Sequence, residues 1–244
     1  MPLGGDGDSI IAAVFVIAIL IVSLGVHEAA HAWVANLCGD STAKDMGRLT
    51  LNPLPHIDPV MTILMPGFLF FLSNGTFVFG GAKPVPVVYQ RLRRPARDMM
   101  LVALAGPLSN VLIALVLFAI LKVLVYAGGW TMDLTDGGVV GFIAEVLLPK
   151  HGPPTLLIDV LCKSIWFNLL LAVFNMIPLP PLDGSRVVAF LLPEPLRSSF
   201  QSLDRFALLL ILGLFYSGVL HGPLRGGISS ALQGLHVITG SYWI

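Results

Sequence analysis

Charged residues are scarce in this chain of 244 residues. Asp, Glu, Lys and Arg make up 11% of it, whereas hydrophobic residues make up 56%. Soluble domains carry about 25% charged residues, so this composition indicates a membrane protein. Fourteen basic and fourteen acidic residues cancel, and a net charge of zero gives no support for a nucleic-acid partner.

Cysteine is nearly absent as well. Cys38 and Cys162 are the only two, and their wide separation excludes a disulfide framework and a cysteine metal site of short spacing.

The first nine residues, MPLGGDGDS, contain no basic side chain. A signal peptide begins with basic residues, so we expect the first apolar run to be retained.

Long apolar runs dominate instead, and a helix needs about 20 such residues to cross the hydrocarbon core. The candidate spans are 10–37, 99–121, 164–182 (beginning nearer 156) and 206–220. Residues 60–82 are also uncharged, but their proline and glycines suit no straight helix. We therefore predict an all-α polytopic membrane protein with about four transmembrane helices. A re-entrant element, a helix over about 58–72 followed by a β-hairpin segment, is expected between the first two.

Basic residues are concentrated in two connecting loops. Lys44, Arg48, Lys83, Arg91, Arg93, Arg94 and Arg97 lie between the first and second spans, and Arg186, Arg197 and Arg205 lie between the third and fourth. Cytoplasmic loops carry an excess of Lys and Arg. We therefore expect both loops in the cytoplasm and the N-terminus outside.

Two histidines and a glutamate interrupt the first apolar run, in HEAAH at 27–31. His27 and His31 are four residues apart and hence share one face of a helix. Two imidazoles so placed can bind one metal ion, while Glu28 between them acts on a metal-bound water. The alternative is a polar patch against another helix, but ionisable groups cost roughly 2.5 kcal/mol or more at mid-bilayer. The stretch therefore favours a metal site.

A two-histidine site needs a third protein ligand, and FNMIPLPPLDG at 174–184 offers one. Asp183 is the only acidic residue between Lys163 and Glu194. The prolines before it break the helix and Gly184 permits a tight turn, so the carboxylate can point sideways at a neighbouring helix. The alternative is an aspartate in an interfacial turn.

Asn175 lies in the same apolar span as the aspartate motif. An amide there needs a partner, and two roles are open. It can bond to a neighbouring helix, or it can donate to a substrate carbonyl as charge develops on the oxygen.

Together, HEAAH and NMIPLPPLDG resemble the signature of the site-2 proteases, which are intramembrane zinc metallopeptidases. ALAGPLSN at 103–110 also resembles the small-residue motif of their middle core helix. The resemblance covers roughly residues 10–190 and is to a compact form without a PDZ domain. It implies that His27, His31 and Asp183 bind one Zn²⁺ per chain, that Glu28 is the catalytic base, and that Asn175 orients or stabilises the scissile carbonyl.

The function implied is hydrolysis of peptide bonds in or near transmembrane segments, with a zinc-bound water as nucleophile and Glu28 as general base and acid. The partners implied are membrane-protein substrates with a transmembrane helix and the lipid bilayer, without nucleic acid; the oligomeric state stays open. We expect a multi-pass protein of a prokaryotic cell (inner) membrane, with its active site towards the cytoplasm. Residues 1–244 form one peptidase domain, with a catalytic core over about 10–190 and a C-terminal helix and interfacial tail over about 203–244.

Two other functions use the same residues. A membrane metal transporter would employ the ligands as a transit site, but it would more naturally lack Glu28 and show paired broken helices or repeats. A catalytically inactive membrane scaffold is the other alternative, and the intact Glu28 argues against it.

The region between the first two spans holds further candidates. His56 and Asp58 offer too few ligands for a second metal site, so we predict structural or cavity-lining roles for them. In FVFGGAKPVPV, prolines at 84 and 86 are typical of an edge strand. We predict that this edge binds an unwound substrate by strand addition, through Thr76, Phe77, Val78 and Phe79. A hairpin that only closes the cavity is the alternative.

Overall fold

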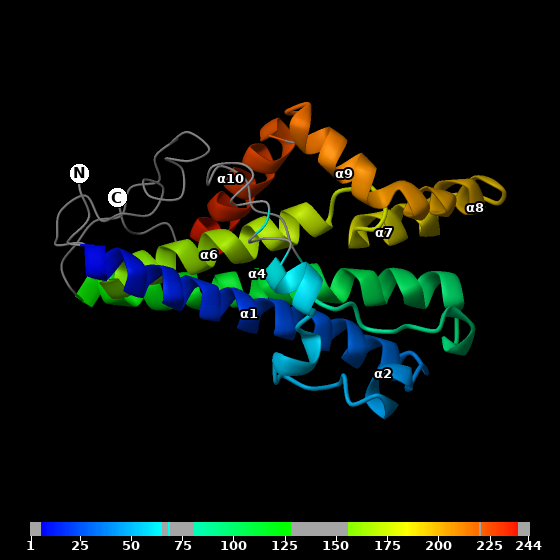
Figure 1. Ribbon diagram of the computed structural model, residues 1–244, viewed down its shortest axis with the longest axis horizontal. Helices are drawn as coiled ribbons and strands as arrows, with labels where there is room; N and C mark the ends of the chain where they lie inside the picture. Colours follow the sequence, from blue (N-terminus) through cyan, green and yellow to red (C-terminus); the bar gives the residue numbers. More distant parts are fainter. Residues whose placement is uncertain (1–5, 65–67, 69–80, 128–155, 220, 239–244) are drawn as a thin grey trace.

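The computed structural model describes residues 6–64, 68, 81–127, 156–219 and 221–238 (Figure 1). These residues form helices and connecting segments and contain no β-strand, so the predicted all-α fold is confirmed for them. The α-helices are α1 (Asp6–Leu37), α2 (Thr42–Asp45), α4 (Pro95–Ala127), α6 (Leu156–Asn175), α7 (Asp183–Leu191), α8 (Leu196–Gln201), α9 (Ala207–Tyr216) and α10 (His221–Ile238). Shorter 3-10 or π-helical turns are η1 (Leu54–His56), η2 (Pro59–Leu64), η3 (Tyr89–Arg91) and η4 (Ser202–Phe206).

Two helices in the described part are long and apolar enough to cross a membrane. Their apolar windows are Ala18–Leu37 in α1 and Pro95–Leu124 in α4, with mean hydropathy 1.5 and 2.3. α4 also carries an exposed apolar stripe, formed by Leu108, Leu112, Val116, Ile120 and Val123. Residues spaced by three or four share one helix face, and a stripe of this kind suits contact with lipid better than with water.

The third predicted span ends earlier than expected. α6 ends at Asn175 instead of continuing to Leu182. Pro178, Pro180 and Pro181 follow that end, and proline supplies no backbone N–H to continue the hydrogen-bond ladder. The chain therefore turns within 176–182 and starts α7 at Asp183.

The fourth predicted span, 206–220, does not form one continuous helix. α9 has 10 residues, which corresponds to about 15 Å, half of the hydrocarbon thickness. It ends at Tyr216, and Gly218 has φ of 74°, a conformation that favours glycine. The chain bends there and continues as α10 (Figure 1).

α4 is the central helix of the bundle. It packs against α1, α6 and α7, while α10 packs against α6. The helices α1, α4 and α6 run side by side along the long axis of the molecule (Figure 1). The larger apolar core joins Ala114, Phe118 and Leu121 of α4 to Ile165 and Leu169 of α6 and to Ile228, Leu232 and Leu235 of α10. Between α1 and α4, buried small residues including Ala32, Ala35 and Ala103 allow the two backbones to come close.

The predicted re-entrant hairpin has no strand in its described part. Residues 81–88 are irregular, and residues 65–67 and 69–80 lie outside the described ranges. Pro84 and Pro86 cannot donate to a strand ladder, and the N–H groups of Lys83 and Val85 have other acceptors. Lys83 donates to the His56 carbonyl at 2.7 Å, and Val85 donates to a side chain of α1. Two of the backbone donors that a hairpin would need are thus already used.

A buried carboxylate joins the end of α1 to this segment. Asp40 is fully buried; its Oδ1 accepts from the N–H (3.0 Å) and the hydroxyl of Thr42, and its Oδ2 accepts from the N–H of Val88 at 2.6 Å. Burial raises the pKa of Asp40, but the hydrogen bonds from Thr42 and Val88 and the charge of Arg91 outweigh it. The pKa of Asp40 is therefore below its usual value.

Asp40→Asn is expected to lower the thermal midpoint of the detergent-solubilised protein. The amide would present its NH₂ to a buried N–H donor, and a buried donor without an acceptor costs about 1–3 kcal/mol. Because the pKa is lowered in the folded state, the stabilisation is complete above the ordinary aspartate pKa of about 3.9 and is lost as the pH falls through the folded-state pKa. The difference in midpoint between wild type and Asp40→Asn should therefore narrow in strong acid.

Asp45→Asn provides the matched control for this measurement. Asp45 is exposed on α2, so the same change of charge should alter stability by no more than about 0.5 kcal/mol. Equal shifts of the midpoint in the two variants would contradict the role assigned to Asp40.

Candidate metal centre

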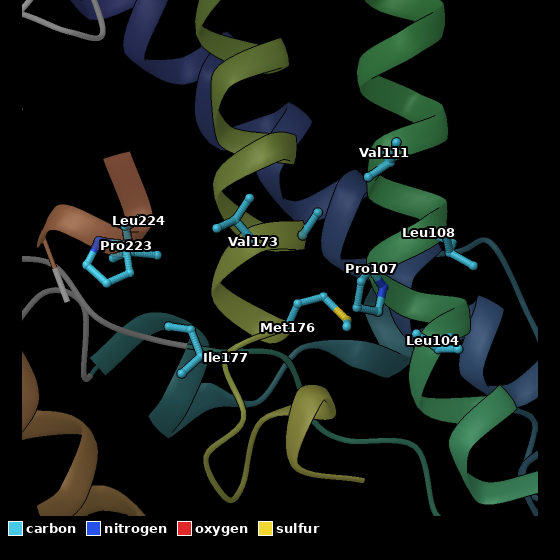
Figure 2. Close-up of a pocket in the computed structure, with 10 residues that line it drawn as sticks. Leu104, Pro107, Leu108, Val111, Val173, Met176, Ile177, Pro223 and Leu224 are labelled. Atoms are coloured by element: carbon cyan, nitrogen blue, oxygen red, sulfur yellow. The ribbon is translucent and has the colours of Figure 1, made fainter. Parts of the chain in front are cut away.

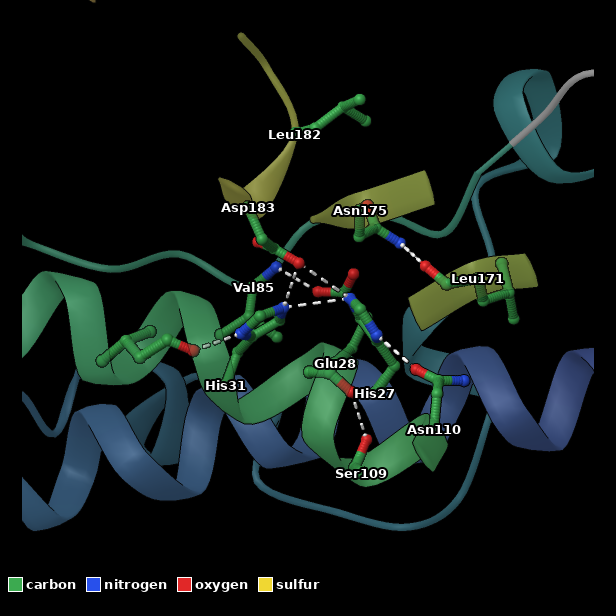
Figure 3. Close-up of polar contacts among 12 residues, drawn as sticks. His27, Glu28, His31, Val85, Ser109, Asn110, Leu171, Asn175, Leu182 and Asp183 are labelled. Atoms are coloured by element: carbon green, nitrogen blue, oxygen red, sulfur yellow. Dashed lines mark hydrogen bonds and ion pairs between the residues drawn. The ribbon is translucent and has the colours of Figure 1, made fainter. Parts of the chain in front are cut away.

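Two imidazoles of α1 meet edge to face inside the bundle (Figure 3). His27 and His31 are both buried, and their Nε2 atoms lie 3.0 Å apart. The four-residue spacing places the rings one above the other on the helix face that packs against α4. Both Nε2 atoms therefore face the same point between the helices, which is the candidate metal position.

Asp183 reaches this place from the first residue of α7. The turn after α6 brings the start of α7 so close to the end of α6 that a Cβ at Gly184 would lie 2.3 Å from the Met176 carbonyl oxygen. The missing side chain at Gly184 thus permits the close approach that positions the aspartate. Asp183 Oδ2 lies 3.3 Å from His27 Nε2 and 3.4 Å from His31 Nε2 (Figure 3).

The chemistry of these three atoms fits a bound zinc ion. Zinc takes histidine nitrogens and carboxylate oxygens at about 2.0–2.2 Å, so that ligand atoms at the corners of a tetrahedron lie about 3.3–3.6 Å apart. The observed separations of 3.0, 3.3 and 3.4 Å come close to this range. Asp183 Oδ2 is buried and accepts no hydrogen bond from the described residues, as expected of an oxygen directed at a cation.

The carboxyl group of Asp183 is ionised at neutral pH. Burial raises the pKa of Asp183, but interactions with the two adjacent imidazoles in their protonated form outweigh burial and hold the pKa at about 2. A carboxylate with two neutral imidazoles is a ligand set of the kind found at catalytic zinc sites.

Gly106 of α4 closes the opposite side of the cluster. A Cβ at this position would lie 2.4 Å from His31 Nε2 and 2.6 Å from His27 Nε2. Any side chain at 106 would therefore enter the space that both Nε2 atoms face. Glycine at this position leaves that space free for an ion.

The outer nitrogens of both imidazoles have partners on α4. His27 Nδ1 lies 2.6 Å from Asn110 Oδ1, and His31 Nδ1 lies 2.7 Å from the Val102 carbonyl oxygen. A carbonyl oxygen only accepts, so each Nδ1 carries a proton, and in the neutral ring each Nε2 keeps its lone pair. This is the tautomer that binds a metal through Nε2.

Glu28 extends beside the cluster and is held by a backbone donor (Figure 3). Its Oε2 accepts from the N–H of Val85 at 2.8 Å. Asn175, the other predicted catalytic residue, donates instead to the Leu171 carbonyl on its own helix at 2.9 Å. The structure thus brings His27, His31 and Asp183 together with Glu28 alongside, whereas the Asn175 amide is bonded within α6.

The remaining sequence candidates do not join the cluster. His56 is buried; its Nε2 lies 3.1 Å from the Thr50 carbonyl oxygen, and its own carbonyl accepts from Lys83. Asp58 caps η2 by accepting from the N–H groups of Val60 and Met61, which lowers its pKa. Both side chains thus contact nearby backbone groups, and their predicted structural or cavity-lining roles stay predictions. Thr76, Phe77, Val78 and Phe79 lie outside the described residues.

An apolar cavity of about 420 Å³ lies between α4, the end of α6 and α10 (Figure 2). Its walls include Leu104, Pro107, Leu108 and Val111 of α4, Val173, Met176 and Ile177 at the end of α6, and Pro223 and Leu224 of α10. Pro107 directly follows Gly106, and Met176 directly follows Asn175. The cavity therefore shares its two main walls with the segments that build the cluster.

Sequence reasoning missed three contributors to the site. Gly106 and Asn110 lie in ALAGPLSN, whose resemblance to the small-residue motif of the middle core helix gave no contact with the histidines. Val85 acts through its backbone N–H, and no residue type signals that role. The first two could have been found by asking which small and polar residues of the middle helix face HEAAH.

Comparison with known proteins agrees with this geometry. Residues 15–215 match peptidase family M50. The chain is 37% identical over 226 residues to YwhC of Bacillus subtilis, a presumed zinc metalloprotease, with 90% of each chain covered. It is 28% identical over 243 residues to Rip2 of Mycobacterium tuberculosis, also a presumed zinc metalloprotease, covering 94% of this chain and 81% of Rip2.

No solved structure matches the chain significantly. The family match nevertheless spans most of the sequence and includes every residue of the cluster. The chain therefore belongs to peptidase family M50, the site-2 protease family.

Proposed function

We propose that the chain is an intramembrane zinc metalloendopeptidase that cuts peptide bonds in or near transmembrane segments of other membrane proteins. The observation that carries this proposal is the place of the cluster of His27, His31 and Asp183. Both histidines lie in the apolar window of α1, and Gly106, which faces them, lies in the apolar window of α4. A peptide bond brought to this site would be cut at membrane depth.

His27, His31 and Asp183 would hold one zinc ion per chain. Bound zinc supplies a Lewis acid for the scissile carbonyl and lowers the pKa of water to about 7. Three protein ligands leave one tetrahedral position open for water or substrate. The names of the two relatives support zinc as the metal.

Glu28 is the proposed general base and acid. The N–H of Val85 fixes one carboxylate oxygen of Glu28, and the other oxygen can accept a proton from the attacking water. Glu28 then returns the proton to the amide nitrogen that leaves. Asn175 would donate to the scissile carbonyl as charge develops on its oxygen, after exchanging its present bond to Leu171 for one to the substrate.

The membrane arrangement we infer has four passes. α1, α4 and α6 make the first three, and α9 with α10 makes a broken fourth pass along α6. The basic residues that follow α1 and α6 support a cytoplasmic location for the ends that carry His31 and Asp183. The site would accordingly face the cytoplasm of a prokaryotic cell, with residues 1–244 forming a single peptidase domain.

Few backbone N–H groups near Pro84 and Pro86 are free to pair with a substrate strand. Between Lys83 and Pro86 every backbone nitrogen either lacks hydrogen or already donates, because Lys83 and Val85 are bonded and the other two residues are proline. A substrate strand could use only carbonyl oxygens here, so we place its main pairing at Thr76–Phe79. The apolar cavity beside Gly106 is suited to hydrophobic side chains of a transmembrane substrate.

The transporter and scaffold alternatives use the same ligands. A transit site has no use for a carboxylate held beside the metal position by a dedicated backbone donor, as Glu28 is. Turnover by the wild-type protein distinguishes the enzyme from the scaffold. Metal flux into liposomes without proteolysis would favour the transporter.

Gly106→Ala is expected to abolish zinc binding and cleavage. The new methyl group would occupy the space that both Nε2 atoms face, and a displacement of about 1 Å at a reacting centre can cost 100-fold in rate. Zinc stoichiometry of the purified protein should fall from one towards zero. Gly213→Ala on α9, where a Cβ meets nothing within 4 Å, should leave zinc unchanged; full zinc occupancy in Gly106→Ala would refute the site.

Glu28→Gln is expected to retain zinc but to lower the rate of cleavage of single-span substrates by roughly 10²–10⁴-fold. Glutamine can still accept from Val85, so the loss would reflect the missing base. The measurement is single-turnover cleavage in detergent, with zinc content determined on the same samples. Glu194→Gln, at an exposed position, serves as the control. Unimpaired cleavage by zinc-loaded Glu28→Gln would contradict the proposed role of Glu28.

A further inference from the structure

A line of buried amide groups runs from His27 across the three main helices. Asn110 Nδ2 on α4 donates to Asn168 Oδ1 on α6 at 3.0 Å. Asn168 Nδ2 donates in turn to Ser23 Oγ on α1 at 3.0 Å and to the Ser164 carbonyl oxygen at 2.9 Å. Asn110 and Asn168 are fully buried, and Ser23 and Ser164 nearly so. Figure 3 shows the first link, between His27 and Asn110.

The direction of every bond in this line follows from one backbone group. The Ser164 carbonyl can only accept, so the group of Asn168 that faces it must be the NH₂. Asn168 therefore turns its oxygen towards Asn110, and Asn110 must present its own NH₂ to that oxygen. The Asn110 oxygen is left facing His27, which must donate from Nδ1 and keeps its Nε2 lone pair.

His31 reaches the same protonation state by a shorter route. Its Nδ1 donates directly to the Val102 carbonyl oxygen at 2.7 Å, and a backbone carbonyl cannot turn round. The partner of His27 is an amide that can turn and offer NH₂ in place of oxygen. His27 therefore needs a second group to hold its partner, whereas His31 does not.

We propose that Asn168 is a positioning residue of the metal centre, which sets the tautomer of His27 through Asn110 although it contacts neither histidine. The Ser164 carbonyl fixes which end of the Asn168 carboxamide faces Asn110. That orientation fixes which end of the Asn110 carboxamide faces His27 on α1. This inference rests on the proposed zinc site. Helix packing alone would not make the effect specific to one of the two histidines.

The primary test is zinc affinity of the purified full-length protein, measured by competition with a chelator. Outer partners of metal-bound histidine contribute about 10- to 100-fold to metal affinity. Asn110→Leu, which removes the direct acceptor, is expected to fall within that range. Asn168→Leu is expected to lose roughly tenfold, its lower end. Asn168→Asp should recover most of the affinity, because a protonated carboxyl group can accept from Asn110 and donate to the Ser164 carbonyl.

Ser164→Ala is the matched control. Ser164 is on the same helix and equally buried, but its hydroxyl donates to the Val160 carbonyl and lies outside the line. Its removal leaves the Ser164 carbonyl in place, so zinc affinity should not change. Ser23→Ala should also have little effect, because the Ser164 carbonyl alone still orients Asn168.

The second readout is the ¹⁵N-labelled histidine spectrum of the zinc-loaded protein, with signals assigned from His27→Ala and His31→Ala. The Nδ1–H of His27 should exchange faster with solvent in Asn168→Leu, while the Nδ1–H of His31 stays protected. If Asn168→Leu does not fold, Asn168→Thr replaces it, since a threonine hydroxyl can bond to the carbonyl four residues earlier and leaves Asn110 without its acceptor.

The outcomes separate this inference from the proposed function. Wild-type protein that binds no zinc would overturn the proposed function and this inference with it. Zinc bound through the two histidines, with unchanged affinity and exchange in the Asn168 variants, would overturn this inference alone. Equal loss of protection at both histidines, or the same loss of affinity in Ser164→Ala, would reduce Asn168 to a packing contact and likewise overturn it.

Discussion

The approach of α4 to the two histidines at Gly106 is the contact on which the rest of the site depends. Without a side chain at that position, the α4 backbone lies against both Nε2 atoms. The same approach brings the Val102 carbonyl and the Asn110 amide within hydrogen-bond distance of the outer nitrogens. α7 packs on α4 as well, so the helix that holds the histidines in place also receives the element that carries Asp183.

Buried polar side chains between the three main helices are hydrogen-bonded to one another, and Asp183 is an informative exception. Asn110, Asn168 and Ser23 satisfy one another, which lowers the cost of placing amides and hydroxyls among apolar helices. Asp183 Oδ2 is buried without a hydrogen bond from the described residues, beside two imidazole lone pairs. When both rings are neutral, the three electron-rich atoms facing one another repel, and a cation among them removes the repulsion. The exception thus marks the place where an ion fits.

Sequence alone could predict which side chains meet. The four-residue spacing of His27 and His31 fixes one helix face, and the broken helix before Asp183 indicates a carboxylate aimed sideways. Hydropathy could not predict where α6 and α9 stop, because it continues past both ends, whereas Pro178 and Gly218 end the helices. The predicted hairpin is not confirmed for residues 81–88, where the backbone donors of Lys83 and Val85 are taken by groups distant in sequence.

Several of the contacts that escaped prediction share one property, which is that backbone atoms make them. Val85 holds Glu28 through its N–H, Val102 holds His31 through its carbonyl, and Gly106 acts through the side chain it lacks. Residue type does not encode a backbone partner, so only the packing of helices distant in sequence reveals it. A short stretch such as ALAGPLSN is therefore informative for its small residues first, because they set the distance at which the backbone of one helix can serve the side chains of another.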